Sequence, residues 1–275
     1  MRTTFRIDPL RPALLGVLLA LLAACTTLPR PALGTFVDRT VSVDGAAHRY
    51  RVFVPAGPAD AAPGSDRARP VVLFLHGSGE RGADGAAPAS VGLGPYLRAH
   101  AATFPALVVF PQVPADQEWA QNAAVAMAAL DAATAEFGGD AARTYLTGIS
   151  MGGYGTWELA LRHPGRFAAL VPVCGGITAP PGRPQLRVAA ADTASDPFAE
   201  TARRLRTVPT WIFHGGRDDV VPPEQSRRMA AALAAAGAGD SHYSEFAGVG
   251  HASWDAAYAH APMWDWLLAH RLGDD

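Results

Sequence analysis

The sequence predicts an α/β fold with a mainly parallel central sheet flanked by helices and opened by an antiparallel N-terminal hairpin. Short apolar runs alternate with helix-length segments along most of the 275 residues, which is typical of βαβ units. Continuous apolar runs such as Val71–Leu75 favour strands that are buried on both faces. The Asp44-Gly45 pair predicts a tight hairpin turn. A composition of 49% hydrophobic and 17% charged residues suits one globular domain.

The hairpin comes first, with strands expected at Thr40–Val43 and His48–Pro55 on either side of the turn. Further strands are predicted at Val71–Leu75, Ala106–Phe110, Thr144–Gly148, Phe167–Val173, Thr210–Phe213 and His242–Phe246. Helices are predicted at Gln121–Phe137, Gly152–Arg162, Pro223–Ala236 and Asp255–Arg271. The segment Thr178–Arg206 shows little periodicity and is rich in Pro, Asp and Arg, so we expect an insertion near the active site.

Residues 1–24 have the features of a signal peptide of lipoprotein type. Arginines precede the apolar run Ala13–Ala24, which is about half the ~20 residues that span a membrane. The run ends in Leu22–Cys25, which resembles the bacterial lipobox, so Cys25 is expected to carry lipid. The alternative is an ordinary signal peptide with an incidental Cys25. We therefore predict an exported protein anchored to a bacterial membrane through Cys25, facing the periplasm or exterior, with a linker at 25–39 and a single domain at 40–275.

Composition and motifs exclude several other classes of function. The 23 Lys and Arg residues against 25 Asp and Glu form no basic run, so we expect no nucleic-acid partner. The spacing Gly77-x-Gly79-x-x-Gly82 matches a dinucleotide fingerprint, but no helix begins after Gly82 and the strand ending at Phe110 carries no acid for a ribose. There is no His-Glu-x-x-His or Cys-x-x-Cys motif, so neither a metal nor a cofactor is expected.

The cysteines also argue against a disulfide framework. The chain has two cysteines, and a lipidated Cys25 leaves Cys174 without a partner. Because Cys174 follows the apolar stretch Phe167–Val173, we expect a buried structural thiol and not a second nucleophile.

The candidate nucleophile is Ser150, in the pattern Gly148-x-Ser150-x-Gly152. A predicted strand precedes it and a predicted helix follows it, which is the setting of the strained turn that exposes a nucleophilic serine. The two glycines leave room for that backbone. The alternative is a glycine-rich turn without catalysis. The context favours a nucleophile, since the pattern alone is modest evidence in a glycine-rich chain.

The candidate base is His251, which lies in a loop between the last predicted strand and the last predicted helix. The order Ser, acid, His along the chain requires a late histidine. His260 and His270 fall within the predicted helix and His242 starts a strand, so solvated or packed roles are expected for these three. The acid should follow the strand Thr210–Phe213. Asp218 and Asp219 both satisfy this requirement, and their positions do not separate them.

Two backbone N–H groups are expected to stabilise an oxyanion. One belongs to Met151, directly after the nucleophile, and the other to Ser78 in the loop after the strand Val71–Leu75.

These residues resemble the α/β-hydrolase superfamily, in its branch of secreted carboxylesterases, predicted peptidases of prolyl-oligopeptidase type and polyester depolymerase-like esterases. The resemblance extends from about Tyr50 to Leu272. Its most specific motifs are His76–Gly82, Tyr145–Trp157, His214–Pro222, and Gly250-His251 with Trp254. The family's acid lies four residues after the histidine of the His-Gly pair, which implies Asp218 here.

The resemblance implies a serine hydrolase that cleaves carboxylic esters, either small esters or acyl, feruloyl or acetyl esters of polysaccharides. One alternative is a serine peptidase, although the chain has no room for the propeller of a prolyl oligopeptidase. The other is a surface lipoprotein that binds a polymer or partner. Loops after the strands should line the pocket, which makes Glu80, Arg81, Gln112 and Trp119 candidates. The structural alternatives are a Glu80–Arg81 ion pair and a packed Trp119.

Overall fold

The computed structural model describes residues 1, 33–57 and 68–273. The chain divides into two units, of which the second, Leu33–Asp275, contains all the secondary structure described below. The expected signal peptide, Cys25 and most of the expected linker lie outside the described residues. Within the described ranges, no helix is both long and apolar enough to cross a membrane.

An eight-stranded sheet runs through the second unit in the order β1-β2-β4-β3-β5-β6-β7-β8. The hairpin strands β1 and β2 are antiparallel, β2 pairs antiparallel with β4, and every later pairing is parallel. This arrangement confirms the predicted fold class. The strands are β1 (Thr35–Val43), β2 (Ala46–Val54), β3 (Arg69–Leu75), β4 (Leu107–Pro111), β5 (Gly139–Ile149), β6 (Ala169–Val173), β7 (Thr210–Gly215) and β8 (Ser241–Phe246).

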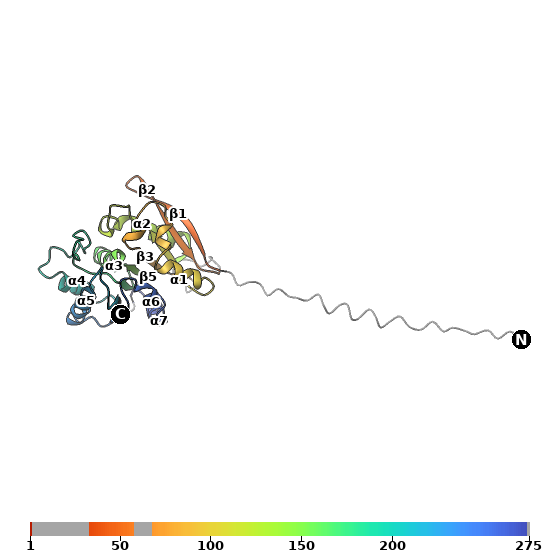
Figure 1. The fold of residues 1–275 in the computed structure, drawn as a ribbon. Coiled ribbons are helices and arrows are strands. Elements are labelled where there is room, and N and C mark those ends of the chain that lie inside the picture. The colour runs from red at the N-terminus through yellow and green to blue at the C-terminus, as the bar shows by residue number, and fades with distance from the viewer. Residues whose placement is uncertain (2–32, 58–67, 274–275) are drawn as a thin grey trace. The chain divides into compact units, whose positions relative to one another are not determined.

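Helices cover both faces of the sheet. Successive residues of a strand point to opposite sides, so a strand with a continuous apolar run has apolar side chains to bury on each face. In β3, Val71, Leu73 and Leu75 belong to one core cluster, whereas Val72 and Phe74 belong to the other. The first cluster packs against α2 (Ala123–Glu136), α3 (Met151–Arg162), α4 (Pro197–Leu205) and α5 (Glu224–Ala235). The second packs against α1 (Leu93–Ala99), α6 (Trp254–Tyr258) and α7 (Ala261–Ala269). Figure 1 shows the β1–β2 hairpin and the pair α4 and α5 at opposite ends of the sheet.

Several boundaries differ from the prediction. Strand β1 begins at Thr35, inside the stretch expected as a linker, because all nine of its residues pair with β2. The predicted final helix is two helices, α6 and α7. Pro262 lies at the start of α7 and has no N–H to continue a helix from α6. Helix α4 falls inside the segment expected to be irregular, where Asp196 accepts hydrogen bonds from the Phe198 and Ala199 N–H groups and so caps it.

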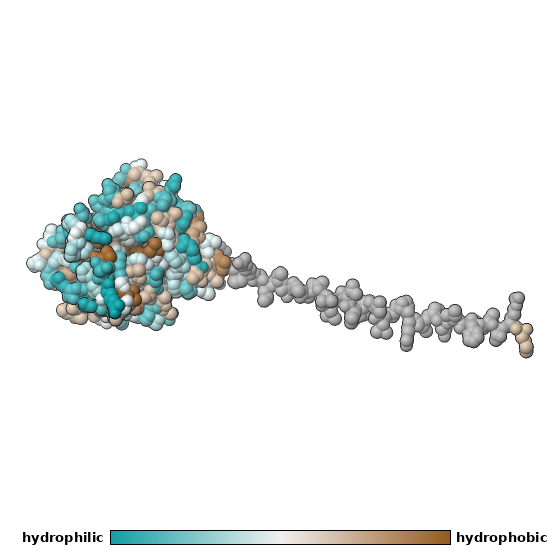
Figure 2. Space-filling view, viewed as in Figure 1, coloured by the Kyte–Doolittle hydropathy of each residue, from teal (hydrophilic) through white to brown (hydrophobic). Residues whose placement is uncertain are grey.

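The described surface offers little hydrophobic area. Among the described residues, Met1 and Leu33 are the large hydrophobic side chains that are exposed. Figure 2 shows a face that is mostly hydrophilic or neutral, with small separate hydrophobic spots.

Helix α3 approaches β3 so closely that a glycine is required at the contact. A Cβ added to Gly152 would lie 1.9 Å from the Leu75 carbonyl oxygen, so either the helix or the strand would have to move. We expect Gly152→Ala to lower the free energy of unfolding by about 1–3 kcal/mol, the usual cost of overpacking. Gly239→Ala is the matched control, because a Cβ there has no atom within 4 Å, and it should change stability by less than about 0.5 kcal/mol. Urea unfolding measures both. Equal stability of the two variants would contradict the proposed contact.

Candidate active site

Ser150 lies on a sharp turn between β5 and α3, with φ 53° and ψ −115°. Positive φ is uncommon for a residue with a side chain and persists where the surrounding structure enforces it. Here the Ser150 N–H donates to the Val173 carbonyl on β6 at 3.0 Å, and the Ser150 carbonyl accepts from the Gly153 N–H at 2.8 Å. The backbone of Ser150 is therefore fixed from both sides.

The two glycines of the motif permit this turn for a steric reason. A Cβ on Gly148 would lie 2.2 Å from the Gly152 carbonyl oxygen, and one on Gly152 would meet Leu75. Neither φ lies in the left-handed region, so close approach, and not conformational freedom, accounts for both glycines. The expectation that they leave room for the turn is correct in this sense.

His251 lies between Ser150 and Asp218. Its Nε2 is 2.9 Å from Ser150 Oγ, and its Nδ1 is 2.7 Å from Asp218 Oδ2. Because the carboxylate can only accept, the imidazole proton belongs on Nδ1, which leaves Nε2 free to accept the Ser150 hydroxyl proton. The structure thus brings together the three side chains expected from the sequence, each at the carboxyl end of a strand: β5, β7 and β8.

Asp218 is the aspartate that contacts His251, whereas Asp219 is exposed. Burial alone would raise the pKa of Asp218. Hydrogen bonds from His214, His251 and the N–H groups of Val221 and Val220 outweigh burial and hold this pKa well below its usual range. The carboxylate therefore stays ionised beside the imidazole.

His214 is a second histidine on the same carboxylate. It is fully buried, and its Nε2 lies 3.1 Å from Asp218 Oδ2 and 2.9 Å from the Val221 carbonyl oxygen. Since both of these atoms accept, Nε2 carries the proton, and Nδ1 accepts from the Ser226 hydroxyl at 2.7 Å. His214 therefore positions Asp218. In the sequence, this histidine serves only to locate the acid, and its contact with Asp218 is not predicted.

The expected oxyanion donors belong to two helix starts on either side of Ser150. Met151 is the first residue of α3, and Ser78 is the first residue of the 3₁₀ helix Ser78–Glu80. N–H groups in a first helical turn have no partner within the helix and can bind an anion. The loop is close to the nucleophile, since a Cβ on Gly77 would lie 3.6 Å from Ser150 Cβ.

His76 holds this loop in place. It is fully buried; its Nε2 accepts from the Val113 N–H at 3.0 Å and its Nδ1 donates to the Gly77 carbonyl at 2.6 Å. Burial lowers the pKa of His76 to about 4. The imidazole is therefore neutral near pH 7 and links the loop to the end of β4. In the sequence, His76 stands out only as part of a motif, and this bridge is not predicted because it depends on a tertiary partner.

The four predicted pocket residues have different environments. Burial raises the pKa of Glu80, and the backbone of Gly77 beside its carboxylate opposes this shift. Arg81 pairs with Glu118 and not with Glu80, so the expected Glu80–Arg81 ion pair is absent from the ion pairs of the described residues. Glu118 was not among the sequence candidates.

Gln112 and Trp119 are buried beneath the loops. The Gln112 amide donates to the Glu80 carbonyl and accepts from the Gly85 N–H. The Trp119 indole donates to the His76 carbonyl at 3.1 Å, and its ring packs directly against Gly155. Both side chains therefore support the loop, as the structural alternative for Trp119 anticipated.

Cys174 is buried beneath the three aligned side chains, as expected for a structural thiol. Its sulfur and ligand atoms of Asp218 and His251 lie within 4.8 Å of one another, which is a spacing that could hold a metal ion. The chemistry fits poorly. Burial raises the pKa of the Cys174 thiol to about 12, whereas metals bind the thiolate, and the other two groups already bind each other.

Comparison with known proteins places the chain in a family. The family model named Esterase matches residues 58–266. The chain belongs to this esterase family. The α/β-hydrolase resemblance seen in the sequence is thereby confirmed, together with the fold. No curated protein sequence matches the chain.

Solved structures agree on the fold of this esterase-family chain. A thermostable esterase is 30% identical with a TM-score of 0.67, over 86% of this chain and 63% of its own. The chain thus spans less than two thirds of that relative's length. A ferulic acid esterase is 16% identical, with a TM-score of 0.62 over 86% of this chain and 96% of its own. An acylaminoacyl peptidase from Pyrococcus horikoshii is 15% identical, with a TM-score of 0.63 over 86% of this chain and 40% of its own.

The neutral state of His76 predicts a pH dependence of stability. Between pH 6.5 and pH 4 the unfolded chain binds a proton at His76 that the folded chain does not, so stability falls as pH falls through this window. At about 1.4 kcal/mol per pH unit, His76 accounts for a loss of about 3 kcal/mol. His76→Gln should be less stable at pH 7 but should lose about 3 kcal/mol less on going to pH 4. Urea unfolding at both pH values measures this difference.

Wild type, measured over the same pH range, is the control. A decline in His76→Gln equal to that of wild type would refute the assignment of a neutral, buried His76.

Proposed function

We propose that this chain hydrolyses carboxylic esters through an acyl-enzyme formed on Ser150. One observation carries the proposal: His251 lies at the carboxyl edge of the sheet with its Nε2 2.9 Å from Ser150 Oγ and its Nδ1 2.7 Å from Asp218 Oδ2, so the three side chains form a continuous hydrogen-bonded series. Membership of the Esterase family supports the same reaction. The nucleophile, the base and the orienting acid are the three parts that serine-based acyl transfer requires.

The reaction proceeds in two displacements. Ser150 Oγ attacks the ester carbonyl while its proton moves to His251 Nε2, and the resulting oxyanion is stabilised by the N–H groups of Met151 and Ser78. The carbonyl re-forms as the bond to the alcohol oxygen breaks, and the imidazolium returns the proton to the departing alcohol. Water then attacks the acyl group, giving its proton to His251, and Ser150 leaves with that proton as the acid is released.

Each supporting residue acts on one of these steps. Asp218 remains ionised and keeps the His251 proton on Nδ1, so that Nε2 can accept. His214 and the Val220 and Val221 N–H groups fix the carboxylate. His76 holds the loop that presents the Ser78 N–H.

Removing one member of the series should cost most of the activity. We expect Ser150→Ala and His251→Ala to lower kcat/KM for a small ester by about 10³–10⁶ and Asp218→Asn by about 10⁴, because the three act as one unit. Asp219→Asn is the matched control and should stay within about twofold of wild type, since its side chain is exposed. A larger loss in Asp219→Asn than in Asp218→Asn would contradict the choice of acid. Labelling of Ser150→Ala by a fluorophosphonate probe would contradict the nucleophile.

The substrate is proposed to be a small ester or an acyl, feruloyl or acetyl ester on a polysaccharide. The alternatives are a serine peptidase of prolyl-oligopeptidase type and a non-catalytic surface lipoprotein that binds a polymer or partner. The complete hydrogen-bonded series argues against the non-catalytic alternative. A panel of esters of increasing acyl length beside aminoacyl amides separates the other two. Faster turnover of the amides would favour the peptidase.

We also propose that the chain is exported and anchored by lipid at Cys25, on the basis of the lipobox-like residues Leu22–Cys25. In a bacterial host, wild type should fractionate with the membrane and incorporate labelled palmitate. Cys25→Ala should do neither, since the thiol is the acylation site. Equal membrane association of the two proteins would contradict anchoring at Cys25.

A further inference from the structure

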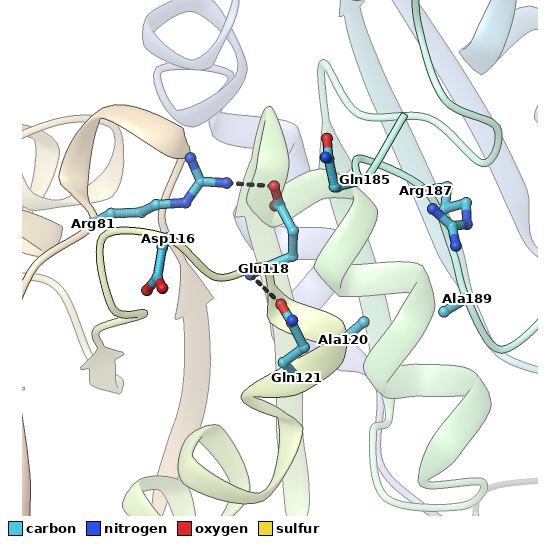
Figure 3. Close-up of a pocket in the computed structure, with 8 residues that line it drawn as sticks. All are labelled: Arg81, Asp116, Glu118, Ala120, Gln121, Gln185, Arg187 and Ala189. Carbon is cyan, nitrogen blue, oxygen red and sulfur yellow. Dashed lines mark hydrogen bonds and ion pairs between the residues drawn. The ribbon is translucent and has the colours of Figure 1, made fainter. Parts of the chain in front are cut away.

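A polar groove begins at the proposed oxyanion loop. A hollow of about 330 Å³ is lined by Ser78, Arg81, Glu118, Gly182, Arg183, Gln185 and Leu186. It shares Arg81, Glu118 and Gln185 with a second hollow of about 430 Å³ that continues away from Ser78. In Figure 3, Arg81 and Glu118 lie on one side of this second hollow, and Gln185 and Arg187 face them from the other. The opposing wall belongs to the segment Thr178–Arg206 that the sequence marked as an insertion near the site.

The hollow that contains Ser78 is suited to a hydrophilic group. Its lining side chains are polar or charged except for Leu186. Pockets that bind alkyl chains are lined mainly by hydrophobic and aromatic side chains. The part of a substrate that enters this groove is therefore expected to be polar.

Two of the three arginines are neutralised within the chain. Arg81 pairs with Glu118, and Arg187 pairs with Asp192 at 2.7 Å. Arg183 is exposed at the end of the groove that contains Ser78. Among residues 33–57 and 68–273 it has no carboxylate partner. Its charge is therefore available to a ligand.

The acidic groups near the groove do not cancel this charge by direct contact. Asp116 lines the second hollow and not the one that contains Ser78 and Arg183. The Glu80 carboxylate lies against Gly77, where an added Cβ would be 3.1 Å from Glu80 Oε2. Glu118 forms its ion pair with Arg81.

The field of Arg183 reaches the side chains around the nucleophile. Tyr154 lies on α3 within one turn of Ser150. Burial and the Asp218 charge raise the pKa of the Tyr154 hydroxyl, and the Arg183 charge opposes them. The hollow itself links Arg183 to the nucleophile, because Ser78 lines it together with Arg183 and a Cβ on the adjacent Gly77 would lie 3.6 Å from Ser150 Cβ.

We propose that Arg183 makes the site selective for esters that carry a carboxylate on the portion lying in the groove beside Ser78. This inference rests on the proposed ester hydrolysis and names the charge of its substrate. An exposed ion pair contributes modestly, so the expected preference is about two- to fivefold in kcat/KM. The pair would form on binding and would lower KM with little change in kcat.

The test compares wild type with Arg183→Gln on two pairs of esters. In each pair one member carries a carboxylate and the other a neutral carboxamide of the same size; one pair places this group on the acyl side and the other on the alcohol side. Wild type should prefer the carboxylate member of one pair. In Arg183→Gln, KM for the carboxylate member should rise, so that the preference in kcat/KM falls by about two- to fivefold. The variant should hydrolyse the neutral member at the wild-type rate. Arg183→Lys should retain most of the preference.

Two controls make the result specific to this charge. Arg206→Gln removes another exposed arginine of the segment Thr178–Arg206, one that lines neither hollow, so its preference should equal that of wild type. Raising NaCl to about 0.5 M should weaken the wild-type preference by screening. If wild type hydrolyses both members of each pair equally, or Arg183→Gln slows both members equally, the proposed function stands and this inference is overturned. If wild type hydrolyses none of the four esters, both are overturned.

Discussion

The close backbone contact among β3, the turn at Ser150 and the start of α3 is the constraint on which the rest of the site depends. The Leu75 carbonyl touches Gly152, and the Val173 carbonyl holds the Ser150 N–H. These contacts hold Ser150 at a φ of 53°, a conformation that a serine with freedom to relax would leave. Because the contacts come from strands on either side of β5, the nucleophile is fixed relative to the sheet itself. Asp218, His251 and Ser78 follow other strands of that sheet, so strand register sets their mutual distances.

Three buried or half-buried histidines have separate roles in the site. His251 faces the nucleophile, His214 holds the acid and His76 holds the oxyanion loop. Each has a proton position dictated by an acceptor: Asp218 for His251, the Val221 carbonyl with Asp218 for His214, and Gly77 for His76. A histidine can fill all three roles because one neutral ring both donates and accepts. The surroundings, and not the residue type, decide which role it takes.

The sequence predicted the parts of the molecule that depend on local pattern. Buried parallel strands appear as continuous apolar runs, and the turn at Ser150 is recognisable because glycine is needed on both sides of it. The choice between Asp218 and Asp219 came from a family resemblance, and the structure supplies its physical basis in the hydrogen bond to His251. The contacts of His76, His214 and Glu118 could not be predicted, since their partners Val113, Ser226 and Arg81 are brought together only by tertiary folding.

Some missed elements did have local signals. Asp196 followed by Pro197 is a helix start, and it marks α4 within the segment expected to be irregular. Pro262 likewise marks the division of the last predicted helix. Helix α1 is harder to predict, because it has seven residues that include a glycine and a proline. In these places short length and helix-breaking residues obscured the periodicity on which the predictions relied.

The segment between β6 and β7 forms one wall of the groove while contributing none of the three aligned side chains. It packs through α4 against α3 and α5, and its connection returns to the sheet at β7. Its loop residues 181–185 are exposed, so their charge can vary without disturbing the turn at Ser150. A fold organised this way separates the residues required for bond cleavage from an exposed stretch of loop, so a change of charge in that stretch alters substrate choice and leaves the reaction intact.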